Sequence, residues 1–141
     1  MLRKISRIWR HERGAAAVEF AILAPVVIMI LLAIADVANM LFMYNDMLNA
    51  ARESARRVAA ADETPAQGKS RAEAALATHH GKRGNKVPFT VTVTVPNGGN
   101  PNGGNATVDV TATMSDMLIL DLFRLFGNIN VRATVNMRME A

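Results

Sequence analysis

The first chemically distinctive group in the sequence is an isolated carboxyl group. Glu19 is the only charged residue between positions 15 and 35, where the chain reads AAAVEFAILAPVVIMILLAIA. Gly14 precedes this stretch, and a residue without a side chain lets a protease approach the backbone closely. Cleavage between Gly14 and Ala15 would create a free α-amine, and on a neighbouring, axially shifted copy that amine would lie level with the Glu19 carboxylate. We therefore predict processing at Gly14 and Ala15, and subunit pairing through Glu19.

The other candidates for chemistry are weaker. His79 and His80 are adjacent, so they point apart on a helix, and no carboxylate is spaced to complete a metal site with them. The absence of cysteine excludes thiol catalysis, disulfide scaffolds and cysteine-based zinc sites. No glycine-rich phosphate loop lies between a strand and a helix. We predict no catalytic residue, no metal, no cofactor and no small-molecule substrate, and hence no enzyme.

The stretch that carries Glu19 has the length and composition of a transmembrane helix. Its 21 residues extend about 31 Å as a helix, close to the hydrocarbon thickness of about 30 Å. A carboxylate costs about 2.5–3.5 kcal/mol at the bilayer centre and less near its edge, so intramembrane acids usually have a partner. Pro25 removes the hydrogen bond to the carbonyl of Ala21, which predicts a flexible point in the helix.

The charge distribution gives the orientation of this span. The formal net charge is +4, and residues 1–14, with five basic residues and one acidic residue, account for all of it. The next basic residue is Arg52. The positive-inside rule then leaves the N-terminus in the cytoplasm and exports the remainder. Because no basic surplus remains beyond the leader, a nucleic-acid partner is not expected. A cleaved signal peptide is the alternative, but its apolar region is usually only about 7–15 residues long.

Residues 36–61 continue the helix as an amphipathic segment. Steps of four and three predict one apolar face, made by Val37, Leu41, Tyr44, Leu48, Ala51, Ala55 and Val58. Glu53 and Arg57 form an i,i+4 pair on the polar side. We expect this face to pack on the protein's own sheet, with a coiled coil as the alternative.

Residues 62–141 predict a small α+β domain. Residues 62–69 have the composition of a linker, and Ser70 with Glu73 predicts a capping box at the start of a short helix that ends near Thr78. A second short helix is predicted from Ser115 to Phe126.

Three strands are predicted in the same domain. Alternation of apolar and polar residues marks residues 87–95, 107–114 and 129–139. The asparagine- and glycine-rich residues 96–105 would join the first two strands as a hairpin loop.

The N-terminal pattern resembles a known family. The run RGAAAVEF before an apolar helix is similar to the processing site of type IV pilins and pseudopilins, where a prepilin peptidase cuts after a glycine and the fifth mature residue is glutamate. Those positions are Gly14 and Glu19 here, although Ala15 stands where phenylalanine is common. GAAAVEFAILAP and the later AARESARRV are more similar to TadE-like proteins of tight-adherence (Flp-type) pilus systems. The resemblance covers residues 10–60, and in pilins a proline placed like Pro25 is associated with local helix melting.

The resemblance implies an α+β, pilin-like fold in which a long N-terminal helix, first transmembrane and then amphipathic, packs on a small three-stranded antiparallel sheet. The expected domains are a cytoplasmic leader (1–14), the span (15–35), the amphipathic helix (36–61) and an extracytoplasmic domain (62–141). The implied function is that of a minor pilin or pseudopilin in the bacterial inner membrane, with its C-terminal domain periplasmic or extracellular, which enters or helps to build a surface pilus.

The expected partners are the inner membrane, the prepilin peptidase and other pilins or pilus-assembly proteins. Two alternatives stay open. One is a pseudopilin of a secretion system, and the other is an uncleaved single-pass anchor that displays a binding domain.

Overall fold

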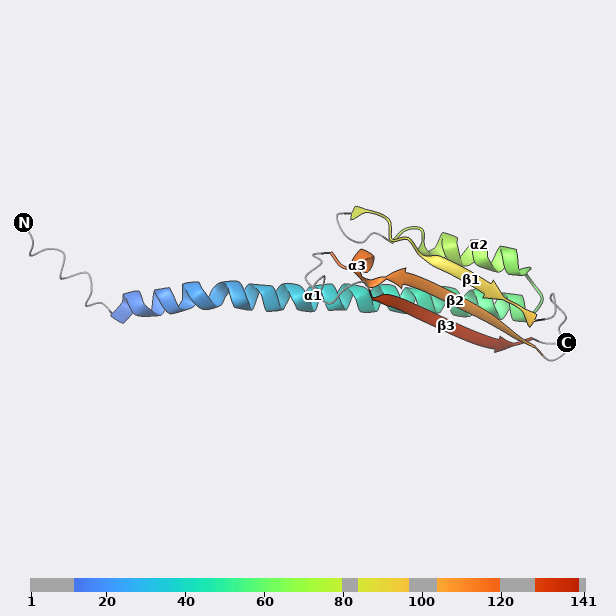
Figure 1. Cartoon of the computed structure of the whole chain (residues 1–141), viewed down its shortest axis with the longest axis horizontal. Helices are drawn as coiled ribbons and strands as arrows, with labels where there is room; N and C mark the ends of the chain where they lie inside the picture. The colour runs from blue at the N-terminus through green and yellow to red at the C-terminus, as the bar shows by residue number, and fades with distance from the viewer. Residues whose placement is uncertain (1–11, 80–83, 97–103, 120–128, 140–141) are drawn as a thin grey trace, which may run out of the picture. The chain divides into compact units, whose positions relative to one another are not determined.

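The computed structural model describes residues 12–79, 84–96, 104–119 and 129–139. The chain separates into two compact units, Met1–Ala35 and Asp36–Ala141. Its elements are α1 (Glu12–Ala59), α2 (Pro65–Leu76), β1 (Thr90–Thr94), β2 (Asn105–Thr113), α3 (Met114–Met117) and β3 (Asn130–Arg138) (Figure 1). A long apolar N-terminal helix with a small antiparallel sheet confirms the predicted α+β fold class.

The described part of the N-terminal unit is the beginning of α1. From Gly14 to Ala35 every side chain is exposed except those of Ala24 and Ala33, which are half-buried. The α-helix continues through Pro25 without a break. A helix satisfies its backbone hydrogen bonds internally, so an apolar sequence can stay helical here without support from the rest of the chain.

In the C-terminal unit the three strands form one antiparallel sheet in the order β1-β2-β3. The register places Val91 opposite Val110, and Val110 opposite Ala133. Because side chains alternate along a strand, these residues face the same side of the sheet, and all three are buried. The three predicted strands are confirmed, with ends that differ by a few residues. The predicted loop between the first two falls largely on residues 97–103, outside the described residues.

Both longer helices contribute to the core over this face of the sheet. One buried cluster joins Met47 and Ala51 of α1 with Ala72 and Leu76 of α2 and with the inward-facing strand residues. The second part of α1 therefore packs on the protein's own sheet, as predicted, and α2 lies beside β1 (Figure 1).

The predicted apolar face of residues 36–61 is right at its C-terminal end and wrong at its start. Val37 and Leu41 are 36% and 51% exposed. The buried positions of this part of α1 are Asp36, Met43, Met47, Ala50, Ala51, Ser54, Ala55, Val58 and Ala59. The buried face is thus rotated by about one residue near its start, because polar Asp36 and Asn39 make hydrogen bonds to the domain and replace apolar packing there.

The prediction of a linker at residues 62–69 is wrong, because α2 already begins at Pro65. Thr64 caps the helix: its Oγ1 accepts from the Gln67 backbone N–H at 3.3 Å, and Gln67 Oε1 accepts from the Thr64 N–H at 2.9 Å. This is a capping box with proline at the first helical position, where its fixed φ suits the helix. The similar spacing of Ser70 and Glu73 lies inside the helix.

A helix is predicted from Ser115 to Phe126, but the described residues of this segment contain only the short helix α3. Helix α3 ends at Met117, and Leu118 is extended, with ψ at 148°. Residues 120–128 lie outside the described residues.

The opposite face of the sheet is polar and rich in threonine. Asp109 Oδ1 accepts from Arg132 Nε at 3.0 Å, and its Oδ2 lies 2.7 Å from Arg132 Nη2, so the pair is bidentate. Hydrogen bonds from Arg132 and then Thr134 lower the pKa of the Asp109 carboxyl group. This face is stabilised by cross-strand polar pairs and needs no covering layer.

Gly68 sets the distance between α2 and α1, which gives a stability prediction. A Cβ added at this position would lie 2.6 Å from Val58 Cγ2 and 2.9 Å from Ser54 Oγ. Gly68→Ala is therefore expected to lower the free energy of unfolding by about 1–3 kcal/mol through overpacking, although alanine is the better helix former.

Thermal unfolding of the detergent-solubilised full chain, followed by circular dichroism, measures this effect. Ser70→Ala, at an exposed position of the same helix, is the matched control and should be close to neutral. A Gly68→Ala protein as stable as the parent would show that the two helices are less closely packed than described.

Candidate functional site

The residues predicted for processing and pairing lie on the first turns of α1. Gly14, Ala15 and Glu19 are all exposed and α-helical. Ala15 and Glu19 are separated by about one helical turn, or about 6 Å along the axis. Among the described residues, none forms a hydrogen bond or ion pair with the Glu19 side chain. If Glu19 has a charge partner, that partner must come from outside the described part of the chain.

Local packing does not explain why residue 14 is glycine. A Cβ added there would have nothing within 4 Å. Glycine inside a helix is less favourable than alanine by up to about 1 kcal/mol, so the fold alone would favour alanine. The choice of glycine at position 14 is therefore compatible with a requirement for close backbone access by another molecule, such as a protease.

The surface around Glu19 is strongly apolar. Val18, Phe20 and Ile22 are 60%, 73% and 68% exposed. Within the described residues one helix is long and apolar enough to cross a membrane, and none of its most apolar window is buried. The core helix of a soluble protein would be mostly buried, so that interpretation of residues 15–35 does not fit. A cleavable signal sequence would meet the same criteria of length and composition.

Residues 14–56 match the family model of TadE-like proteins. The chain is TadE-like over this segment. TadE-like proteins are associated with tight-adherence pilus systems, so the match points to a pilus-associated component, and the apolar helix is consistent with a single membrane pass. No curated protein and no solved structure matches the chain.

The limits of the TadE-like match coincide with features of α1. The match begins at Gly14, the residue predicted to precede the cut, and ends at Arg56, close to the end of the helix. It covers under a third of the chain and none of the sheet. The family match therefore concerns the helix.

Two polar residues at the start of the C-terminal unit were missed from the sequence. Asp36 is fully buried, and its Oδ1 accepts from the Ile119 backbone N–H at 3.1 Å. Asn39 Nδ2 donates to the Met117 carbonyl at 2.7 Å. Together they fasten the segment that follows β2 to α1. The available signal was their position, because both lie on the side of the helix that later carries Met43 and Met47.

His79 contacts α1 through its side chain. Its Nε2 lies 2.7 Å from Asp46 Oδ2, and its ring meets Phe89 edge-on at 6.0 Å between centroids. Within the described part of the chain, no three His, Cys, Asp or Glu side chains are grouped as a metal ion would require. His80 lies outside the described residues. His79 therefore has a structural contact with α1 that the sequence did not reveal.

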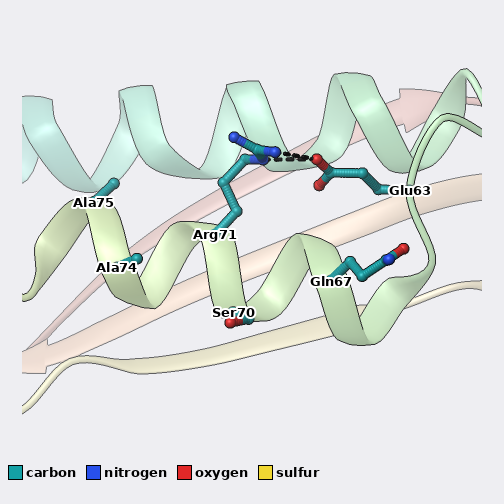
Figure 2. A pocket seen from close by; sticks show the side chains of 6 residues that line it. All are labelled: Glu63, Gln67, Ser70, Arg71, Ala74 and Ala75. Atoms are coloured by element: carbon teal, nitrogen blue, oxygen red, sulfur yellow. Dashed lines mark hydrogen bonds and ion pairs between the residues drawn. The ribbon is translucent and has the colours of Figure 1, made fainter.

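An open groove on α2 is the other feature that could be taken for a site. Figure 2 shows it, with Arg71 reaching across to Glu63. The residues that line it are Glu63, Gln67, Ser70, Arg71, Ala74 and Ala75. Arg71 Nε donates to Glu63 Oε1 at 2.7 Å, and Arg57 Nη1 on α1 lies 3.8 Å from the same oxygen. The carboxylate is therefore neutralised by one cation from each helix, and the lining residues include no base beside a nucleophile.

The Glu63 side chain is only 11% exposed, so its charge state affects stability. The hydrogen bond from Arg71 lowers the pKa of Glu63 below its ordinary value. The stabilisation is therefore complete above the unfolded-state pKa of about 4.3 and is lost as the pH falls through the lower folded-state pKa. Glu63→Gln is expected to lower the unfolding midpoint at pH 7 and to have much less effect near pH 3.

Urea unfolding at the two pH values measures this difference. Glu73→Gln is the matched control, because its pair with Lys69 is longer, at 3.8 Å, and more exposed. It should change the midpoint less than Glu63→Gln at pH 7. An effect of Glu63→Gln that is as large at pH 3 as at pH 7 would contradict the assigned ion pair.

Proposed function

We propose that this chain is a minor pilin or pseudopilin of a tight-adherence pilus, which a prepilin peptidase processes after Gly14. In this proposal the protein is held in the inner membrane by residues 15–35, with its N-terminus in the cytoplasm, and it acts by assembly with other pilins and not by catalysis. The observation that carries the proposal is an exposed carboxylate, Glu19, in the otherwise uncharged residues 15–35 of a helix that matches the TadE-like family from Gly14 onward.

The chemistry of the pairing follows from what cleavage creates. A cut after Gly14 leaves the α-amine of Ala15 as the new N-terminus, four residues before Glu19. A neighbouring subunit shifted along the helix axis by about one turn brings its amine level with this carboxylate. In lipid an ion pair of this kind removes the penalty of an uncompensated charge and fixes the axial register between subunits.

The proposal assigns Pro25 a separate role. Its missing N–H leaves one backbone carbonyl without a helical partner, which makes local opening easier. Such a point would let the helix adjust when a subunit leaves the bilayer for the fibre.

The C-terminal part of α1 also supports an assembly role over a cleaved signal peptide. Met43, Met47 and Ala51 are buried in the core of the C-terminal unit and lie on the same helix as the apolar segment. A cut near Ala35 would free this helix from its anchor, whereas a cut after Gly14 would keep the anchor and the domain on one helix.

Processing gives the first functional prediction. Sequencing of the mature N-terminus from cells with the peptidase is expected to give Ala15-Ala16-Ala17, and from cells without it the unprocessed leader. Gly14→Leu should leave the protein unprocessed even with the peptidase present, because a bulky side chain blocks the approach to the scissile bond. Detection of Met1 as the N-terminal residue in both cell types would contradict cleavage after Gly14 and would favour the uncleaved single-pass anchor.

Glu19 gives the second functional prediction. Glu19→Ala removes the carboxylate but leaves the apolar helix, so membrane insertion and processing should persist while the yield of assembled surface fibre falls at least tenfold. Ile22→Ala, which shortens an exposed apolar side chain on the same helix, is the matched control and should assemble. Electron microscopy of fibres and immunoblots of membrane fractions measure the two effects. Normal assembly of Glu19→Ala would count against the pairing.

The secretion-system alternative is tested by deletion of the gene. Loss of surface fibres with normal protein secretion agrees with the proposal, and the reverse phenotype favours a secretion pseudopilin.

A further inference from the structure

The strand β3 lies at an edge of the sheet, and two backbone hydrogen bonds show which of its residues face the free side. The sheet order is β1-β2-β3, so within the described residues no strand lies beyond β3. The Met114 N–H donates to the Ile129 carbonyl at 2.7 Å, and at the other end of the same ladder the Met139 N–H donates to the Gly104 carbonyl at 3.0 Å. In an antiparallel pair, opposite residues are bonded to each other only at every second position. Odd-numbered residues of β3 therefore bond to β2, and even-numbered residues direct their N–H and C=O groups to the free edge.

This free edge is long and exposed. The residues that direct their backbone groups to it all have exposed side chains, and they are Asn130, Arg132, Thr134, Asn136 and Arg138. Along about 27 Å of strand they present alternating donors and acceptors, as a further strand requires. Sheet edges are commonly protected by proline, by a bulge or by a covering element. β3 contains no proline and pairs with β2 without a bulge, so its edge lacks two of these protections.

The opposite edge of the sheet, at β1, is protected. By the same pattern Val91 and Val93 direct their backbone groups away from β2, but Val91 is only 2% exposed. Helix α2 lies beside β1 (Figure 1), and Pro88 and Pro96, which have no N–H, flank the strand. Within the described residues, the sheet is therefore open to strand addition at β3 and closed to it at β1.

The core-facing side of β3 is also incompletely covered. On the central strand β2, Val108 and Val110 are fully buried. On β3, Val131, Val135 and Met137 face the same side of the sheet but are only half-buried. An added strand would place its own side chains beside these three and would remove more of their apolar surface from water, which is favourable.

The charges of β3 determine which kind of strand fits. The strand has two arginines and no acidic residue. Arg132 is already paired with Asp109, whereas Arg138 is exposed and has no ion pair within the described residues. If β3 of a second copy were added, the antiparallel register that pairs all nine residues would be centred on Thr134 and would place Arg132 diagonally next to Arg138 of that copy. Like charges at neighbouring cross-strand positions repel, so the edge favours a strand with acidic side chains over a second copy.

We propose that the free edge of β3 binds an extended, acidic segment of another protein, which becomes the fourth strand of the sheet. Alternate residues of that segment are apolar and cover Val131, Val135 and Met137, and the residues between them include a carboxylate that pairs with Arg138. Backbone hydrogen bonds to the even-numbered residues of β3 supply affinity, while the apolar and acidic positions supply specificity. The proposal goes beyond the role in pilus assembly and depends neither on cleavage after Gly14 nor on Glu19.

A synthetic peptide provides the probe for this edge. It is as long as β3, has blocked ends and a fluorescent label, and alternates threonine with valine. Glutamate replaces threonine at both ends, so that the peptide can bind in either direction. Its binding to the detergent-solubilised full chain is followed by fluorescence anisotropy. A second peptide with lysine in place of each glutamate is the charge control.

The first test removes one backbone donor from the edge. Asn136→Pro loses an edge-facing N–H without losing a bond to β2, and Asn136→Ala is the matched control that keeps this N–H. The dissociation constant of the glutamate peptide is expected to be at least tenfold higher for Asn136→Pro than for Asn136→Ala, with the same circular dichroism spectrum for both proteins. Equal affinities of the two variants, or no binding by the parent chain, would overturn the proposal.

The second test changes the charge and leaves the backbone unaltered, so it stands even if Asn136→Pro folds poorly. Arg138→Glu is expected to weaken binding of the glutamate peptide at least fivefold and to strengthen binding of the lysine peptide. An unchanged preference between the two peptides would overturn the acidic partner.

A second copy of the chain is the competing occupant. The chain has no cysteine, so Thr134→Cys supplies a single thiol at the centre of the symmetric register. The proposal expects neither Thr134→Cys nor the control Thr92→Cys on β1 to form a disulfide-linked dimer. Rapid dimer formation by Thr134→Cys alone would overturn the choice of another protein as the occupant.

Discussion

A charged carboxylate on an apolar helix surface is the constraint on which the account of this molecule depends. Glu19 lies among exposed Val18, Phe20 and Ile22, and within the described residues nothing neutralises it. In lipid such a group costs about 2.5–3.5 kcal/mol at the bilayer centre if it stays charged and unpaired. In a membrane helix such a carboxylate must either lie near the bilayer surface or pair with a cation from another group. In the proposed assembly a processed neighbour would supply that cation, and the ion pair would set the axial register between subunits.

The same helix serves two environments, and the residue types change where the environment changes. Between Val18 and Ile34 most of the exposed side chains are large and apolar, while from Met43 onward the buried face of α1 is made of methionine, alanine, one serine and one valine. Alanines at positions 51 and 55 keep α1 thin where the sheet packs, and Gly68 does the same for α2. Because the core of the C-terminal unit is built on α1, the sheet cannot fold in the same way without it. In the proposed function, a helix that is both anchor and core element would keep the subunit in one piece as it moves between membrane and fibre.

Much of this arrangement could be predicted from the sequence, because the strongest patterns arise from a single physical cause. Strict alternation predicted the three strands, since one face of each strand is buried, and a long apolar run predicted the exposed part of α1.

The prediction errors occur where a polar residue makes the contact that an apolar residue was expected to make. Asp36 was left out of the predicted buried face although it is fully buried and accepts a hydrogen bond from the Ile119 backbone N–H, so the start of that face was misplaced. Thr64 and Pro65 were taken for a linker because a capping box was assigned six residues too late, at Ser70. The contact of His79 with Asp46 joins residues far apart in sequence, and no local pattern predicts such a pair. Gly14 and Glu19 were selected as candidates by chemistry and resemblance, and the roles proposed for them depend on other molecules, which the structure of a single chain does not contain.

The most direct test of the central claim is a distance between two subunits. Fibres grown from an equal mixture of subunits, one labelled with ¹⁵N at the Ala15 amine and the other with ¹³C at the Glu19 carboxyl carbon, allow the intersubunit carbon–nitrogen coupling to be measured by solid-state NMR. The account predicts strong dipolar dephasing, with a carbon–nitrogen distance of about 4 Å or less, as expected for an ion pair. Fibres that form normally but show no such coupling between the two labelled atoms would contradict it.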